Sequence, residues 1–189
     1  MPASPTVGFA NMLPPLYAGW MKALLEGPVL DETQATCAAC AMASHPGAWA
    51  DERELAFKPN AKCCTYHPAL PNFSVGMALA DASAEAARGR AALERQIALR
   101  KGATPLALGP TKKAHEDFER EKVERFGRDR ELLCPYYEDE GGGLCNIWRY
   151  RNSTCATYFC KFVRGAVGRI FWRDTLRPLL AAIERVLGQ

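Results

Sequence analysis

The sequence has no hydrophobic run approaching the roughly 20 apolar residues that a membrane-spanning helix needs. It also has no Lys or Arg near its start, and Pro14 and Pro15 interrupt the only apolar stretch there. No secretory signal is therefore indicated. We expect a cytoplasmic protein with no membrane partner. Free thiols stay reduced in that compartment, which favours metal or redox chemistry over structural disulfides in a cysteine-rich chain.

Several motifs of known enzymes are also missing. The chain has no glycine-rich phosphate loop, no HExxH pair and no serine nucleophile elbow, and it contains only three histidines. No catalytic residue is predicted as a result. The question of whether the chain is an enzyme with an auxiliary cluster stays open.

What is present suits one globular domain. The chain has 189 residues, of which 48% are apolar and 24% charged. Residues 1–12 are rich in Pro, Ala and Ser, and predict a flexible arm before a single domain over 13–189. The fold class that we expect is mainly α, with several helices and long irregular cysteine-rich loops organised around metal sites.

Helical periodicity and breakers place the expected helices, and no strand is predicted. The four helical segments run from Pro14 to a stop at Gly27, over 74–101 with a possible break at Gly89, over 111–130 as a charged, solvated helix, and over 162–187 with a kink at Pro178. A further helical turn is expected at 51–57.

The eight cysteines lie in the irregular regions 37–64 and 134–160. These regions are longer than plain loops usually are, so something has to hold them, and a bound metal would do so. Thiolate ligands select zinc or iron–sulfur clusters, and four per site is the usual number. The first arrangement that we expect has Cys37, Cys40, Cys63 and Cys64 on one site and Cys134, Cys145, Cys155 and Cys160 on another.

Alternatives to this arrangement stay open. One shared site with spare thiols is possible, and an even number of cysteines also permits disulfides. The tandem cysteines, Cys63 and Cys64, favour a cluster over a single ion, because neighbouring side chains diverge and a cluster is larger than an ion. Alternatively, one of the two is a ligand and the other a buried thiol.

The cysteine pattern resembles the CxxCxxCC (YkgJ-like) cysteine-cluster family, which is described as zinc- or iron-chelating. The later motif of that family runs Cys-Pro-Phe-Leu, then Gly-x-Cys-x-Ile-Tyr, an arginine and a further cysteine. Cys134-Pro135-Tyr136-Tyr137 and Gly143-Leu144-Cys145-Asn146-Ile147-Trp148 match the two blocks, Arg151 falls on the arginine and Cys155 on the last cysteine. The long gap between Cys40 and Cys63 departs from the family. The resemblance implies metal binding and no particular reaction.

The C-terminal quarter is basic, with eight Lys or Arg and two Asp or Glu from residue 142 onward. Arg149, Arg151, Lys161 and Arg164 are expected to offset the charge of about −2 that four thiolates leave on Zn²⁺ or on an oxidised [4Fe–4S] cluster. Interleaved aromatic residues would also suit single-stranded nucleic acid. That partner is not favoured, because the isoelectric point is only about 8.4. His67 is interpreted as a loop or outer histidine rather than a ligand.

The sequence therefore predicts a metalloprotein that binds one or two [4Fe–4S]-type clusters for electron transfer or redox sensing, with an unknown redox or protein partner. The alternative is a structural Zn²⁺-binding protein that acts as a protein or nucleic-acid interaction module.

Overall fold

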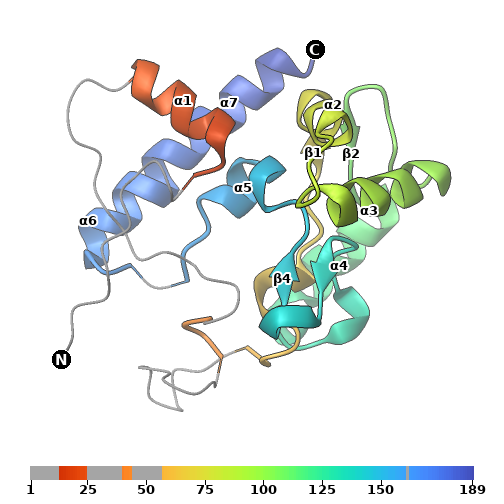
Figure 1. The fold of residues 1–189 in the computed structure, drawn as a ribbon. Helices are drawn as coiled ribbons and strands as arrows, with labels where there is room; N and C mark the ends of the chain where they lie inside the picture. Colours follow the sequence, from red (N-terminus) through yellow and green to blue (C-terminus); the bar gives the residue numbers. More distant parts are fainter. Residues whose placement is uncertain (1–12, 25–39, 44–56, 161) are drawn as a thin grey trace.

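The computed structural model describes residues 13–24, 40–43, 57–160 and 162–189, and this part of the chain is mainly helical, as predicted (Figure 1). The helices are α1 (Pro15–Leu24), α2 (Asn72–Ala80), α3 (Ala87–Ala98), α4 (Lys112–Arg125), α5 (Ser153–Ala156), α6 (Gly165–Arg169) and α7 (Arg177–Leu187). The strands, which were not predicted, are two residues long and form two antiparallel pairs: β1 (Leu70–Pro71) with β2 (Ala107–Leu108), and β3 (Tyr137–Glu138) with β4 (Leu144–Cys145).

Some predictions concern residues outside the described ranges. These are the arm at 1–12, Cys37, most of the turn at 51–57, and Lys161. In the described part of the chain, no helix is long and apolar enough to cross a membrane.

Helix α1 packs across the C-terminal helices, because both present apolar side chains at helical spacing (Figure 1). Tyr17 and Met21 are one turn apart in α1, and Trp172, Leu176 and Leu180 repeat at the same interval in the C-terminal segment. The buried side chains of this first core are Leu13, Tyr17, Met21, Ala156, Phe159, Trp172, Leu176 and Leu180.

The C-terminal segment is one continuous helical rod from α6 to α7 (Figure 1). Its middle, η7 (Ile170–Leu176), is π-helical, and Pro178 lies in the first turn of α7. Proline has no N–H to donate to the preceding turn and its ring crowds that turn. The sequence predicted a kink at Pro178 unless two helices meet there. The structure has Pro178 in the first turn of α7, directly after the π-helical segment with which α7 is continuous.

The segment predicted as one helix over 74–101 is two helices, α2 and α3. The break lies at Asp81 and the residues after it, not at Gly89. The Asp81 carboxylate accepts the backbone N–H of Ser83 at 2.9 Å, a local bond that competes with the helix. Gly89 lies inside α3, where a Cβ atom would come within 2.4 Å of the Asn146 carbonyl oxygen. This glycine thus lets α3 pack closely against the cysteine-rich segment.

Helices α2 and α3 enclose a second core with the two short strands β1 and β2. Its buried side chains are Leu70, Ala78, Ala92, Leu93, Leu108, Tyr136 and Ile147. Cys134 and Cys145 pack against this core. The second core therefore supports Cys134 and Cys145 from one side.

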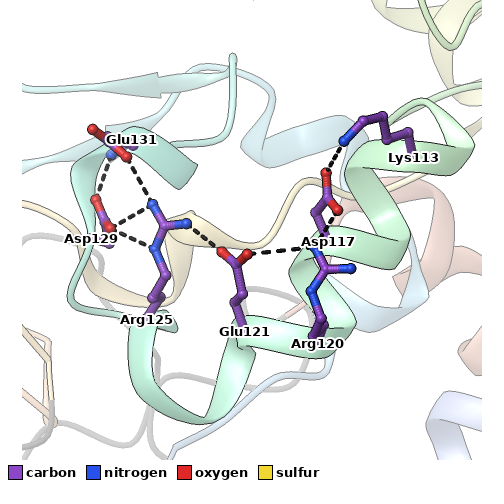
Figure 2. Close-up of polar contacts among 7 residues, drawn as sticks. All are labelled: Lys113, Asp117, Arg120, Glu121, Arg125, Asp129 and Glu131. Carbon is purple, nitrogen blue, oxygen red and sulfur yellow. Dashed lines mark hydrogen bonds and ion pairs between the residues drawn. The ribbon is translucent and has the colours of Figure 1, made fainter.

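Helix α4 has no buried residue, which confirms the predicted solvated helix. The Thr111 side chain caps it by accepting the Ala114 N–H at 3.2 Å. Phe118 and Phe126 cover the rings of Tyr66 and Tyr158, with centroid distances of 5.6 and 6.0 Å. The outward charges of α4 pair with one another (Figure 2).

Candidate metal centre

The tandem cysteines lie on one 3-10 turn, η3 (Lys62–Thr65). Lys62 has a left-handed backbone with a φ of 56°, which few non-glycine residues adopt. Its buried ammonium group donates to the carbonyl oxygen of Gly142, and to that of Gly143 at 3.2 Å. The Lys62 side chain therefore ties the tandem cysteines to the glycine turn between β3 and β4.

The β3–β4 hairpin and the residues before it supply two more cysteines. Cys145 lies opposite Tyr137 in the hairpin, and the glycines at 141–143 form the turn with positive φ angles of 65°, 81° and 83°. The backbone N–H of Cys134 donates to the carbonyl oxygen of Cys64 at 2.7 Å. This bond joins the upstream and downstream cysteine regions directly.

Cys155 lies on the single turn of α5, which is fixed from two sides. The Asn152 side chain accepts the Cys155 backbone N–H at 3.0 Å as the cap of the turn. The Glu184 carboxylate accepts the backbone N–H of Ser153 at 2.6 Å and its hydroxyl at 2.7 Å. The buried Tyr17 hydroxyl donates to the same carboxylate, so α1 and α7 together hold the turn that carries Cys155.

Five cysteines on these elements line one cavity of about 300 Å³, which we call the cysteine cavity. They are Cys63, Cys64, Cys134, Cys145 and Cys155. The rest of the wall is largely aromatic and apolar, and includes Tyr66, Phe118, Phe126, Tyr136, Ile147 and Tyr158. Exposed Glu119 and Lys122 of α4 also line the cavity, so it reaches solvent beside that helix. All seven described cysteines are thiols, with no disulfide among them.

The thiols surround a space rather than converge on a point. Among the described residues, no three Cys, His, Asp or Glu side chains are close enough to share one metal ion. An engineered cavity of about 150 Å³ is large enough for benzene. The space of about 300 Å³ in this protein therefore suits a group of several atoms better than a single ion.

The pKa values of the thiols around the cavity are shifted in different directions. The pKa of Cys63 is lowered, chiefly because the Cys64 thiol donates a hydrogen bond to it and also because the Arg151 guanidinium is near. Burial raises the pKa of Cys155, although the charge of Arg151 opposes the rise. The charge of Arg151 thus lowers the pKa of two thiols, one from the upstream and one from the downstream cysteine region.

Burial also raises the pKa of Cys134 well above its ordinary value, and the neighbouring Cys145 and Cys155 sulfurs add to the rise. The backbone N–H of Tyr136 donates to the Cys134 sulfur and works in the other direction. Enclosed thiols of this kind ionise when a metal supplies positive charge. The donor set therefore fits a cationic group bound through sulfur.

Two guanidinium groups line the cavity. Arg151, which the sequence predicted, lies over the Trp148 ring at 4.9 Å. Arg177 of α7 was not predicted, and it is held by bonds to the Thr157 hydroxyl at 2.9 Å and carbonyl oxygen at 3.0 Å. In the sequence Arg177 looks like one more charged residue on an amphipathic helix. Its place at the cavity becomes apparent only from the packing of α7 against Thr157.

Of the other predicted basic residues, Arg149 and Arg164 do not line the cavity. Arg149 is exposed and lies 3.5 Å from the carboxylate of Asp81. Arg164 is exposed at the start of α6. Among the described residues, the cationic side chains that line the cavity are Arg151, Arg177 and the exposed Lys122.

The structure brings cysteines from both expected sites to one cavity, while Cys37 of the first expected site lies outside the described residues. The tandem cysteines share a cavity with Cys134, Cys145 and Cys155, because the Cys134–Cys64 backbone bond and the Lys62 side chain hold both regions together. Cys40 and Cys160 are described but are not lining residues of this cavity. Five of the eight predicted ligands therefore lie around the same cavity.

Comparison with protein-family models, with curated proteins and with solved structures finds no match for this chain. The resemblance to the CxxCxxCC family thus rests on the residues of its motifs alone. What the fold and the site define is a mainly helical chain with one cavity lined by five cysteines.

Proposed function

We propose that the cysteine cavity binds one iron–sulfur cluster of the [4Fe–4S] type, for electron transfer or redox sensing. The observation that carries this proposal is the arrangement of five thiols around one space of about 300 Å³, where no three donors among the described residues are close enough for a single ion. A polynuclear cluster needs thiolates spread around it, which is the arrangement found.

The ligands come from separate parts of the chain. Cys134 precedes β3, Cys145 is in β4 and Cys155 is in α5, and one of the tandem cysteines on η3 would supply the fourth ligand. Five lining thiols exceed the four that a cluster takes, so one of the tandem pair stays a buried thiol beside the site.

The surroundings suit a negatively charged cluster. Four thiolates leave an oxidised [4Fe–4S] cluster with a charge of about −2. Arg151 and Arg177 bring positive charge to the same cavity, and the Tyr136 backbone N–H donates to the Cys134 sulfur. Such groups stabilise ligand sulfurs and tune their reduction potential. When bound, the cluster would supply one-electron transfer, while the protein would hold it and limit its contact with water.

The open side of the cavity indicates where electrons would pass. Glu119 and Lys122 are exposed and line the cavity, so α4 is the element between the thiols and solvent. A redox partner would approach over α4. The resemblance to metal-chelating proteins in the cysteine motifs agrees with this proposal.

The test is to measure iron, acid-labile sulfide and zinc per chain, on protein purified without oxygen. We expect iron and sulfide in cluster proportion. Replacement of Cys134, Cys145 or Cys155 by Ser should remove most of the iron. The Cys160→Ser variant is the matched control and should retain it, because Cys160 does not line the cavity. Stoichiometric zinc without iron would favour the structural zinc function instead, and neither metal with paired thiols would exclude both.

A further inference from the structure

Tyr136 presents a polar group that the protein itself does not satisfy. Its side chain is fully buried, and its hydroxyl has no hydrogen-bond partner in the described part of the chain. Leaving a buried donor unpaired costs roughly 1–3 kcal/mol. Buried polar atoms without a partner are few in folded proteins, and an unseen ion or ligand is one common explanation.

The position of Tyr136 indicates which ligand could accept a hydrogen bond from its hydroxyl. The residue lines the cysteine cavity and belongs to the second core, against which Cys134 and Cys145 pack. Both are proposed cluster ligands. The ring therefore lies beside the two thiols that the second core supports.

The Tyr136 ring has little freedom to turn elsewhere. Its backbone N–H donates to the Cys134 sulfur, and its carbonyl oxygen accepts the Asn146 N–H at 2.9 Å. The ring packs in the second core and meets His67 edge to face, with 6.0 Å between centroids. Since both the main chain and the ring are fixed, the hydroxyl is positioned before any ligand binds.

We propose that the Tyr136 hydroxyl donates a hydrogen bond to a sulfur of the cluster bound in the cysteine cavity, and so raises the reduction potential of that cluster. The inference rests on the proposed function. A phenol hydroxyl is a donor at neutral pH, and ligand thiolates and cluster sulfides are acceptors. Reduction adds negative charge to the cluster, so a hydrogen bond to sulfur stabilises the reduced form more than the oxidised form.

The test compares the wild-type protein with Tyr136→Phe, both purified without oxygen. The variant should keep the iron and sulfide content of the wild type, since Phe retains the ring and removes only the hydroxyl. Its midpoint potential should be lower. We expect the midpoint potential to fall by up to about 59 mV, which for a one-electron couple is a change of about tenfold in the ratio of reduced to oxidised cluster.

Tyr150→Phe is the matched control. The Tyr150 hydroxyl donates to the Asp81 carboxylate, and Tyr150 is not a lining residue of the cavity. This second variant should leave the midpoint potential unchanged. A potential that falls equally in both variants would overturn the inference, because the effect would then not be specific to the cavity.

The outcomes separate the two proposals. If the wild type holds no cluster, both fail. If the wild type and Tyr136→Phe hold the cluster at the same potential, the inference fails and the proposed function stands. If Tyr136→Phe does not fold, the hydroxyl has an essential partner in the protein, which also overturns the inference. Loss of part of the iron, with a lowered potential in the cluster that remains, would support it.

Discussion

The outer face of α4 and the interior around the cysteine cavity both hold charged side chains in networks, but in different surroundings. On and just after α4, Lys113 pairs with Asp117 at 2.9 Å, and Arg125 bridges Glu121 and Asp129, all partly exposed to water (Figure 2). In the second network, the partly buried Glu184 carboxylate accepts hydrogen bonds from three donors on the buried residues Tyr17 and Ser153.

The comparison shows that the number of polar contacts in a network does not determine how much the network stabilises the folded protein. An exposed ion pair contributes roughly 0–1 kcal/mol, because water and salt replace it readily. A buried donor that loses its acceptor costs roughly 1–3 kcal/mol, because no water takes its place. Two networks with similar numbers of contacts should therefore lose very different amounts of stability when a carboxylate is replaced by alanine.

The largest effect is expected for Glu184→Ala. The change leaves the Tyr17 hydroxyl and the backbone N–H and hydroxyl of Ser153 without their acceptor. We expect a loss of about 3 kcal/mol in the free energy of unfolding, measured by chemical denaturation. Iron content should also fall, because the turn that carries Cys155 loses one of its two supports.

Glu184→Gln is the control for this experiment. The amide keeps an acceptor oxygen and nearly the same volume, so the loss should be clearly smaller than in Glu184→Ala. Equal losses in the two variants would show that the negative charge, not the hydrogen bonds, matters. A loss below about 1 kcal/mol in Glu184→Ala would contradict the contrast between interior and surface.

A slightly smaller effect is expected at His67 when the pH is lowered. Burial lowers the pKa of His67 to about 4, from an ordinary value of 6.5. Between these values the unfolded chain binds a proton that the folded chain does not, so acid favours unfolding. Stability should therefore fall as the pH drops from about 6.5 to about 4, by roughly 2–3 kcal/mol from this group.

The His67 contribution is measured as a difference between wild type and His67→Phe, each unfolded by denaturant at pH 7 and pH 4.5. The variant keeps an aromatic ring against Tyr136 and has no titrating group at this position. Asp81 and other carboxylates titrate in both proteins and cancel. If the two proteins lose the same stability between these pH values, His67 is not held neutral by burial.

The sequence predicted the elements with strong periodicity. The apolar repeats of α1 and α7 and the charged pattern of α4 appear as helices close to the expected limits. These elements depend on contacts at i, i+3 and i+4, which a linear pattern shows directly. The break between α2 and α3 was misplaced, because Gly89 looked like the weak point while the side chain of Asp81 determines the break.

The sequence predicted metal ligands in both cysteine regions, but it placed the two regions on separate sites first and left a shared site only as an alternative. That meeting depends on a backbone hydrogen bond between Cys134 and Cys64 and on the left-handed conformation of Lys62. Neither feature has a signal in residue type or spacing. The β1–β2 pair and the position of Arg177 were missed for the same reason, since only contacts between distant segments create them.

The smallest effect is expected for Glu121→Ala on α4. The carboxylate pairs with Arg125 and lies 3.6 Å from Arg120, but Arg125 keeps Asp129 and Glu131 as partners (Figure 2). Alanine also has the highest helix propensity, which offsets part of the lost attraction. The change in the free energy of unfolding should be a small fraction of that in Glu184→Ala, and should disappear in about 1 M salt, where charges are screened within about 3 Å.

Glu124→Ala is the matched control on the same helix, since Glu124 is exposed and has no ion pair within the described ranges. The two variants should differ slightly at low salt and not at all at high salt. If Glu121→Ala instead lowered stability as much as Glu184→Ala, the α4 network would stabilise the fold cooperatively. The position of α4 beside the cysteine cavity would then depend on its outer charges as much as on the cavity-lining rings of Phe118 and Phe126.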